Sequence, residues 1–444
     1  MSRAMLARRV ITLGVAALVL SGCTSLTDPD GQQVLSSPTT NNAGAPGFTD
    51  PSLLRVPGLS WASGEGLPEY QIHRVTLDQA REAVRDRDYT EVSTTEKLVT
   101  TGTLLIPFGL DETGTLAGFT GQQSDHPIDA VLFSGATGVG RYTDGKLARF
   151  TEHGKNFLPP ETAIGLGSVG PEGTVWSEPD EDWQSGRWRI LWVPHGQSEV
   201  RVLASSADVQ DPTQQPPTYY GASTPVFSNG RVFWHASFHA EDSALIVPKL
   251  LSVAFDEPGH VRIEDAEGFD PVPVGSEILY VGTQRPAPGS EPAALGAPVP
   301  AQIAVLDASG TARSLVELSP EAPPANQIMN LGAQQGIVSF TYLGDFYIAN
   351  TLTGKVIALP MPSGTGVANV VHCDQRVSFR FSDGGHAAAS ARYVYDVASE
   401  SLLVVQDPNF TGGAQCAGDL ISWSVAKQLD GHSRQWDVMT RWKR

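Results

Sequence analysis

The sequence predicts an all-β fold built from repeated hairpins. Charged residues make up only 18% of the 444 residues, whereas glycine (45) and proline (32) are abundant. This mixture suits short strands joined by tight turns. Six segments share one pattern, in which an alternating strand, a tight turn and a second alternating strand follow one another. These segments are 139–151, 189–204, 249–265, 302–318, 346–360 and 391–406.

A second landmark precedes most of these hairpins. It is a turn containing Gly or Asp, followed by a short strand that ends in an aromatic residue. The hairpin turns recur every 44–63 residues, a length that accommodates four strands. Because one four-stranded sheet cannot bury both of its faces alone, we expect these units to stack around an axis as the blades of a β-propeller. The landmark strands lie in 173–177, 229–234, 275–280, 336–340, 375–379 and 418–423.

The number of units predicts a single propeller of seven blades, each with four antiparallel strands, and leaves six or eight blades as alternatives. Six outer hairpins are followed by 420–426 and 434–442, which make a seventh unit without a last strand. A strand from the other end of the chain can complete such a blade and close the ring. We therefore expect a closing strand from residues 55–109, for example 70–77 or 97–108, within a propeller domain that covers 53–444.

Two segments depart from the repeat. In 76–89, Thr76 and Gln79 form a capping pair ahead of helix-forming residues, which favours a short helix within 55–110. Segment 286–300 is rich in Pro, Ala and Gly, and we expect a surface loop there.

The clearest copy of the repeat is 225–234 (PVFSNGRVFW). It resembles the repeat of TolB-type, WD-like β-propellers, and 306–310 (LDASG) resembles the later hairpin turn of the same repeat. The other copies are degenerate, so the resemblance covers 125–444 loosely and concerns architecture. It implies protein partners, although function does not follow from fold.

The first 22 residues have the pattern of an export signal. Basic residues precede the apolar run 10–20, which is shorter than the roughly 20 residues that span a membrane. The run ends in Leu-Ser-Gly-Cys at 20–23, which resembles the lipobox of bacterial lipoproteins. The resemblance implies cleavage of 1–22 and attachment of a diacylglyceryl group to the Cys23 thiol. The alternatives are an ordinary secretory signal with a chance cysteine, and folded export through a twin-arginine signal at Arg8 and Arg9.

The segment that follows is expected to be a flexible tether. Residues 24–52 are rich in Ser, Thr, Pro, Gly, Asn and Asp and lack apolar periodicity. Removal of 1–22 leaves 27 basic and 48 acidic residues, a net charge of −21. Such a chain repels nucleic acid and anionic headgroups. We expect an exported protein, held only by its lipid on the outer side of the cytoplasmic membrane, or on the outer membrane where the host has one.

Two cysteines remain besides Cys23. Cys373 and Cys416 lie 43 residues apart, close to one blade period, and each directly precedes the landmark strand of its unit. Equivalent positions in adjacent blades come close near the central channel. In an oxidising compartment the pair is predicted to form a disulfide; the alternative is two free buried thiols.

Sequence motifs for catalysis are absent. The chain contains no Gly-x-Ser-x-Gly elbow, no His-Glu-x-x-His pair and no phosphate-binding loop. We therefore predict no cofactor, no catalytic residue and no metal site. One cluster, His235, His239, Glu241 and Asp242, has metal-binding residue types, but strand spacing holds the two histidines about 13 Å apart, and a solvated loop explains it better.

Two further clusters are candidate ligand sites. Asp180, Glu181 and Asp182 lie among four tryptophans, and acids beside aromatic rings suit a sugar or a cation; packing between blades is the competing interpretation. Tyr219 and Tyr220 follow a Pro- and Gln-rich loop and suit contact with a partner, or local packing. The tryptophans are Trp176, Trp183, Trp188 and Trp192.

These observations favour a binding protein over an enzyme. We expect a lipid-anchored propeller that acts as a scaffold or accessory lipoprotein for an envelope or membrane protein, without nucleic acid. The alternative is a hydrolase or lyase that acts on envelope glycans with acids around the central channel. A third hypothesis is ligand delivery to a transporter. Paired acids in a deep polar funnel favour the enzyme, whereas a flat aromatic patch favours a partner.

Overall fold

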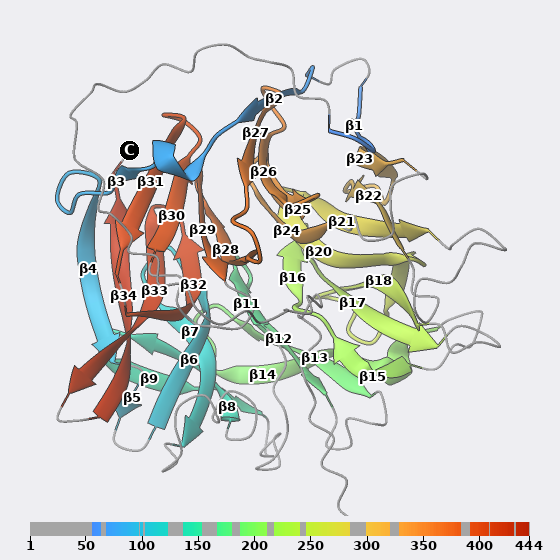
Figure 1. Cartoon of the computed structure of the whole chain (residues 1–444). Helices are drawn as coiled ribbons and strands as arrows, with labels where there is room; N and C mark the ends of the chain where they lie inside the picture. Colours follow the sequence, from blue (N-terminus) through green and yellow to red (C-terminus); the bar gives the residue numbers. More distant parts are fainter. Residues whose placement is uncertain are drawn as a thin grey trace, which may run out of the picture.

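The protein is a seven-bladed β-propeller (Figure 1). Seven antiparallel sheets stand in a ring around a central axis, as the sequence predicts. The computed structural model describes residues 56–63, 68–96, 98–100, 103–122, 136–152, 167–179, 187–210, 217–239, 246–284, 299–319, 328–382, 391–407, 409–429 and 432–443.

Blades 1 to 3 come first along the ring, and their strands are given from the inside outward. Blade 1 contains β6 (Thr103–Leu110), β7 (Leu116–Gln122), β8 (Ala136–Thr143) and β9 (Lys146–Arg149), with β5 (Leu98–Thr100) beside β6. Blade 2 contains β11 (Gly167–Gly170), β12 (Gly173–Pro179), β13 (Trp188–Pro194) and β14 (Glu199–Ser205), with β10 (Thr151–Glu152) outside. Blade 3 contains β15 (Pro217–Ala222) and β16 (Val226–Ser228), both beside β17 (Arg231–His239), then β18 (Ile246–Ala254) and β19 (Arg262–Asp265).

Blades 4 to 7 complete the ring. Blade 4 contains β20 (Gly268–Val274), β21 (Glu277–Gln284), β22 (Val299–Leu306) and β23 (Ala312–Leu318). Blade 5 contains β24 (Met329–Gln334), β25 (Ile337–Tyr342), β26 (Asp345–Asn350) and β27 (Lys355–Pro360). Blade 6 contains β28 (Gly366–Cys373), β29 (Arg376–Ser382), β30 (Ala391–Asp396) and β31 (Ser401–Gln406). Blade 7 contains β32 (Phe410–Ala417), β33 (Leu420–Leu429), β34 (His432–Trp442) and β4 (Tyr89–Glu96).

The six hairpins expected from alternation are the outer strand pairs of blades 1 to 6, and the landmark strands are the second strands of blades 2 to 7. Their turns have the backbone conformation that the sequence requires. Asp144 and Gly145, for example, join β8 to β9 with φ angles of 49° and 78°. Two successive positive φ values match the right-handed twist of the strands in a two-residue turn.

The N-terminal part of the chain runs along the outer edges of four consecutive blades (Figure 1). Strand β1 (Leu59–Trp61) pairs antiparallel with β23 of blade 4. Strands β2 (Gln71–Arg74) and β3 (Arg81–Glu82) pair parallel with β27 of blade 5 and β31 of blade 6. Strand β4 then supplies the missing outer strand of blade 7 by pairing with β34. Because the next strands begin blade 1, this pairing closes the ring.

The closing strand lies within the expected range 55–109, but in neither of the two segments given as examples. Segment 70–77 contains β2, which adds to blade 5, and 97–108 contributes β5 and β6 of blade 1. The closing strand β4 has the largely polar sequence YTEVSTTE, so no apolar alternation marks it. The expected short helix is reduced to one 3-10 turn, Leu77–Gln79, where the Gln79 side chain accepts a hydrogen bond from the Thr76 N–H at 2.9 Å.

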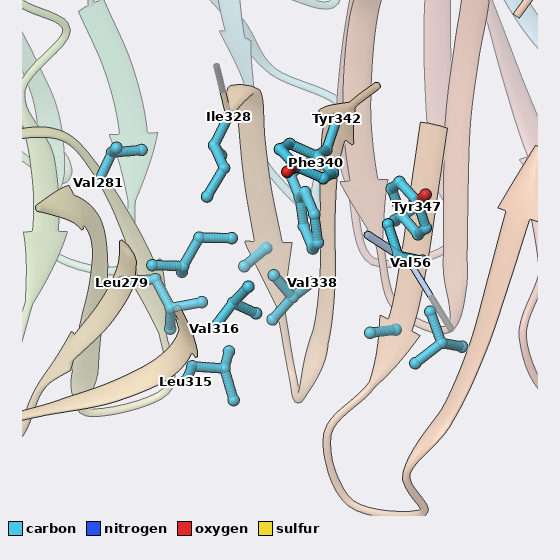
Figure 2. Close-up of a cluster of buried hydrophobic side chains, with 14 of the residues drawn as sticks. Val56, Leu279, Val281, Leu315, Val316, Ile328, Val338, Phe340, Tyr342 and Tyr347 are labelled. Atoms are coloured by element: carbon cyan, nitrogen blue, oxygen red, sulfur yellow. The ribbon is translucent and has the colours of Figure 1, made fainter. Parts of the chain in front are cut away.

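The hydrophobic core lies between the blades. Each of the seven boundaries between neighbouring blades holds one cluster of buried apolar side chains. Figure 2 shows the cluster between blades 4 and 5, where Leu279 and Val316 pack opposite Val338 and Phe340. Val56, from the N-terminal part of the chain, joins the same cluster. Each blade therefore buries both faces, as the stacking argument expects.

The predicted disulfide is confirmed. Cys373 ends β28, and Cys416 lies on β32, the inner strands of blades 6 and 7; their Cα atoms are 5.7 Å apart. The bond joins blade 6 to blade 7, the blade that the N-terminal strand β4 completes. The helical turns in the described part of the chain are too short to span a membrane.

Reduction of the disulfide should destabilise the ring at its closing blade. The cross-link encloses a 43-residue separation, worth about 4 kcal/mol in the chain-entropy model. We expect a melting temperature several degrees lower after reduction, because each kcal/mol shifts Tm by about 2–4 °C in domains of 150–250 residues and by less in larger ones. Calorimetry with and without reductant measures the shift, and hydrogen exchange should rise first in β32–β34 and β4. Unchanged exchange there would contradict a stapling role.

Candidate functional site

A cavity of about 820 Å³ lies at the centre of the ring. All seven innermost strand positions contribute to its wall, so it is the central channel of the propeller. Much of the wall is apolar or backbone, and the polar side chains on it come from different blades. Six of these polar residues are Ser168, His235, Asp270, Gln334, His372 and Gln415.

Several of the polar channel groups bond to the neighbouring blade. Ser168 on β11 donates to the Pro225 carbonyl at 2.5 Å, and Gln415 on β32 donates to the Pro107 carbonyl at 3.1 Å. His235 on β17 accepts the backbone N–H of Asp270 at 3.0 Å through Nδ1. These three hydrogen bonds join blade 2 to blade 3, blade 7 to blade 1, and blade 3 to blade 4.

His372 occupies a tighter place in the wall. Its ring lies against Gly332 of blade 5, where a Cβ atom would sit 2.3 Å from His372 Cε1. Its Nε2 atom is buried and has no hydrogen-bond partner among the described residues. Burial lowers the pKa of His372 to about 3, so the ring is neutral at any physiological pH.

His235 lies in a similar environment, and its pKa is also lowered. Burial lowers its pKa, while the charge of Asp270, whose carboxylate Oδ1 lies 3.5 Å from Nδ1, acts in the opposite direction. The accepted N–H bond assigns the ring proton to Nε2. Asp270 is the one carboxylate residue among those that the structure places in the channel wall.

The number of carboxylates in the described channel wall bears on the alternative of a glycan hydrolase or lyase. Most glycoside hydrolases use two carboxyl groups on opposite sides of the scissile bond, whereas the described wall offers Asp270 alone. Within the described residues, no three His, Cys, Asp or Glu side chains gather as a metal site. His235 points into the channel, His239 ends β17, and Glu241 and Asp242 lie outside the described residues.

The other sequence candidates are only partly described. Asp180, Glu181 and Asp182 lie outside the described residues, as does Trp183. Trp176 and Trp188 are 2% and 1% exposed, and Trp188 contacts Trp234 of blade 3 edge to face, with ring centroids 5.5 Å apart. Packing between blades is the role of these two rings. Tyr219 and Tyr220 lie on β15, and their contact with a partner stays a prediction.

A surface with two further hollows lies away from the channel. The turns that join the first to the second strand of every blade, and the third to the fourth strand of blades 1 to 6, lie at one end of the ring, which we name the short-turn face. Two hollows open there: the blade 5–6 hollow, of about 640 Å³, and the blade 6–7 hollow, of about 570 Å³. Gln375 and Ala398 line both, so the two hollows are neighbours, with the turns of blade 6 between them.

The blade 6–7 hollow is built by four separate parts of the chain. Arg81 donates to both oxygens of Asp88 at 2.8 and 2.9 Å, and this bond is the largest cause of the lowered pKa of Asp88. Arg376, 4% exposed, pairs with Asp396 at 2.9 Å and donates to the Lys443 carbonyl at 2.7 Å. The N-terminal turn, blade 6 and the C-terminal strand are thereby fixed around one opening.

Sequence reasoning missed this site. Its one signal was the presence of Arg81, Arg85 and Arg87 within seven residues of a strongly acidic chain, inside the segment expected to be a helix. The other residues that line the hollow come from positions about 300 residues later, which no local pattern reveals.

No family model and no curated protein matches the chain. Among solved structures, the chain is similar to an oligogalacturonate lyase in complex with manganese, at 12% identity and a TM-score of 0.47, over 80% of this chain and 96% of that one. It is also similar to an oligogalacturonate lyase from Vibrio parahaemolyticus, at 10% identity and a TM-score of 0.46, over 79% and 96% of the two chains. A prolyl endopeptidase matches at 16% identity and a TM-score of 0.44, over 77% of this chain but only 46% of the endopeptidase. At these identities the likeness says nothing about activity.

The contact between His372 and Gly332 predicts a costly substitution. Gly332→Ala should destabilise the protein by about 1–3 kcal/mol, because the added methyl forces the His372 ring or its strand to move. The matched control is Gly138→Ala on β8, where the nearest atom, Thr120 Oγ1, would be 3.5 Å from the new Cβ. Urea unfolding of both variants measures the difference, and equal stability would contradict the close contact.

The neutral His372 predicts a loss of stability in acid. In the unfolded chain the imidazole takes up a proton below its ordinary pKa of 6.5, whereas the folded ring stays neutral down to about 3. Between these two pKa values the unfolded state binds more protons than the folded state. The free energy of unfolding therefore decreases by up to about 1.4 kcal/mol for each unit by which the pH is lowered. Urea unfolding of His372→Gln between pH 7 and 4 should show a smaller fall than the native chain. Substitution of the exposed His260 to Gln is the control; an identical pH slope in all three would refute the prediction.

Proposed function

We propose that this chain is an exported lipoprotein, acylated on Cys23, whose propeller binds an envelope or membrane protein. The observation that carries the proposal is the disulfide between Cys373 and Cys416. Structural disulfides persist in oxidising compartments outside the cytosol. This bond therefore supports export independently of the N-terminal motif.

The N-terminal sequence supplies the means of attachment. A basic start, a short apolar run and Leu-Ser-Gly-Cys at 20–23 occur in the order of a lipoprotein signal. The acidic net charge of −18 disfavours both nucleic acid and anionic headgroups as partners. Membrane contact through the lipid alone leaves the propeller faces free for a protein.

The distribution of polar groups favours binding outside the channel. Several channel side chains are already bonded between blades, and the two channel histidines have lowered pKa values. On the short-turn face, by contrast, charged side chains such as Arg87 and Lys443 line an opening. A broad rim with charged hollows suits a scaffold or accessory role.

Anchoring should depend on one thiol. Cys23→Ser should move the protein from the membrane fraction to the soluble or shed fraction, or leave an uncleaved precursor, because lipid attachment and cleavage both require the cysteine. Cys416→Ser is the control and should remain in the membrane fraction. Membrane fractionation with intact-mass analysis measures both, and a membrane-bound Cys23→Ser protein of normal processed mass would refute the lipoprotein proposal.

A further inference from the structure

The two hollows of the short-turn face lie on either side of the blade 6 turns, and we name the pair the furrow. The furrow is lined by blade 5, blade 6, the N-terminal strands and the end of β34. Hollows of about 640 and 570 Å³ each fall within the size range of ligand sites in proteins. Because Gln375 and Ala398 line both hollows, an extended ligand that crosses these turns can reach both.

The two ends of the furrow carry opposite charge. In the blade 6–7 hollow, four cations face three carboxylates, in a chain whose net charge is −18. In the blade 5–6 hollow, the carboxylates of Glu69 and Glu400 outnumber the single ammonium of Lys355, which pairs with Glu400. The cations of the first hollow are Arg81, Arg87, Arg376 and Lys443, and its carboxylates are Asp88, Asp374 and Asp396.

Three buried guanidinium groups lie on blade 6. Arg376 and Arg380 are four residues apart on the same face of β29, and Arg392 lies on the adjacent strand β30. All three are at most 6% exposed. Burial, followed by the charge of Arg380, lowers the pKa of Arg392 to about 9, so the group is still protonated at neutral pH. Of the three, Arg376 lines the blade 6–7 hollow, where it pairs with Asp396.

The walls of the two hollows suit a peptide backbone. They present amide and hydroxyl side chains: Gln71 and Asn350 in the blade 5–6 hollow, Ser399 and Ser401 in the blade 6–7 hollow, and Gln375 in both. Such groups can both donate and accept hydrogen bonds, which matches the alternating N–H and C=O groups of an extended chain.

We propose that this furrow binds an extended, mixed-charge peptide segment of a partner protein, with an acidic side chain in the blade 6–7 hollow and a basic side chain in the blade 5–6 hollow. The proposal rests on the proposed function and names the surface and the partner chemistry. A free phosphate or carboxylate would use only the positive hollow. An acidic glycan carries one sign of charge along its length and would meet Glu69 and Glu400 at the other end.

The test compares peptides that differ only in charge pattern. The probes are the block peptides acetyl-EEEGGKKK-amide and acetyl-KKKGGEEE-amide, and the alternating peptide acetyl-EKEGGKEK-amide of the same composition. Calorimetric titration of the purified full chain should show one block peptide binding roughly tenfold more tightly than the alternating peptide, a difference of about 1.4 kcal/mol. Equal affinity for all three, or no binding, would overturn the proposal.

Matched variants locate the site. Arg87→Gln with Lys443→Gln removes two exposed cations from the blade 6–7 hollow and should weaken block-peptide binding roughly tenfold. Arg262→Gln with Arg313→Gln removes two exposed arginines at the turns of blades 3 and 4 and should leave binding unchanged. Glu69→Gln should weaken binding from the other end of the furrow. An equal effect of both double variants would overturn the assignment.

Two further probes separate the alternatives. If decaglutamate binds as tightly as the block peptide, the ligand is an acidic polymer. If inorganic phosphate binds as tightly, the site binds free anions. Either result overturns the proposal. Thermal melts of every variant confirm folding. Because none of these measurements depends on Cys23, a failed anchoring experiment and a failed binding experiment are distinguishable.

Discussion

The packing of each blade against both of its neighbours is the constraint on which the rest of the structure depends. Seven apolar clusters occupy the seven boundaries, and none of them belongs to one blade alone. An open ring would expose two of these faces at once. The pairing of β4 with β34 therefore completes blade 7 and at the same time keeps every other boundary buried. The disulfide between β28 and β32 reinforces the same region from the channel side.

The course of the N-terminal segment follows from the same need. A propeller blade exposes the hydrogen-bonding edge of its outer strand, which is a site for unwanted pairing. Strands β1, β2 and β3 cover this edge in blades 4, 5 and 6 before β4 enters blade 7. Apolar side chains on the way, including Val56, Ile72, Val75 and Ala83, enter the clusters between the blades. The segment thus contributes backbone pairing and core packing together.

The same geometry divides the polar groups of the protein into two sets. Channel groups such as Ser168, His235 and Gln415 lie where inner strands converge, so their partners are the neighbouring blades. Charged groups on the short-turn face lie where outer strands diverge and hollows open between the turns. Arg376 belongs to both sets, since it is almost fully buried, pairs with Asp396 and still lines the blade 6–7 hollow. A ligand at this place would contact the ring where its two ends meet.

The sequence by itself determined the features that depend on neighbouring residues. Strand alternation and the turn pairs such as Asp144-Gly145 specify the outer hairpins, because a two-residue turn fixes the register of both strands. Equivalent placement of Cys373 and Cys416 in successive repeats identified the disulfide, since repeats place equivalent residues side by side. The number of blades follows from the count of these units and the incomplete last one.

The tertiary structure alone decided the features that depend on distant partners. Strand β4 is polar and β3 has only two residues, so neither carries a periodic signal; both exist because the edges of β34 and β31 offer unpaired backbone groups. The apparent helix signal at Thr76 and Gln79 was limited to one turn because pairing with β31 begins at Arg81. The blade 6–7 hollow joins Arg81, Arg376 and Lys443, which are separated by hundreds of residues in the chain. Only closure of the ring, which depends on all seven boundaries at once, brings these charges to one opening.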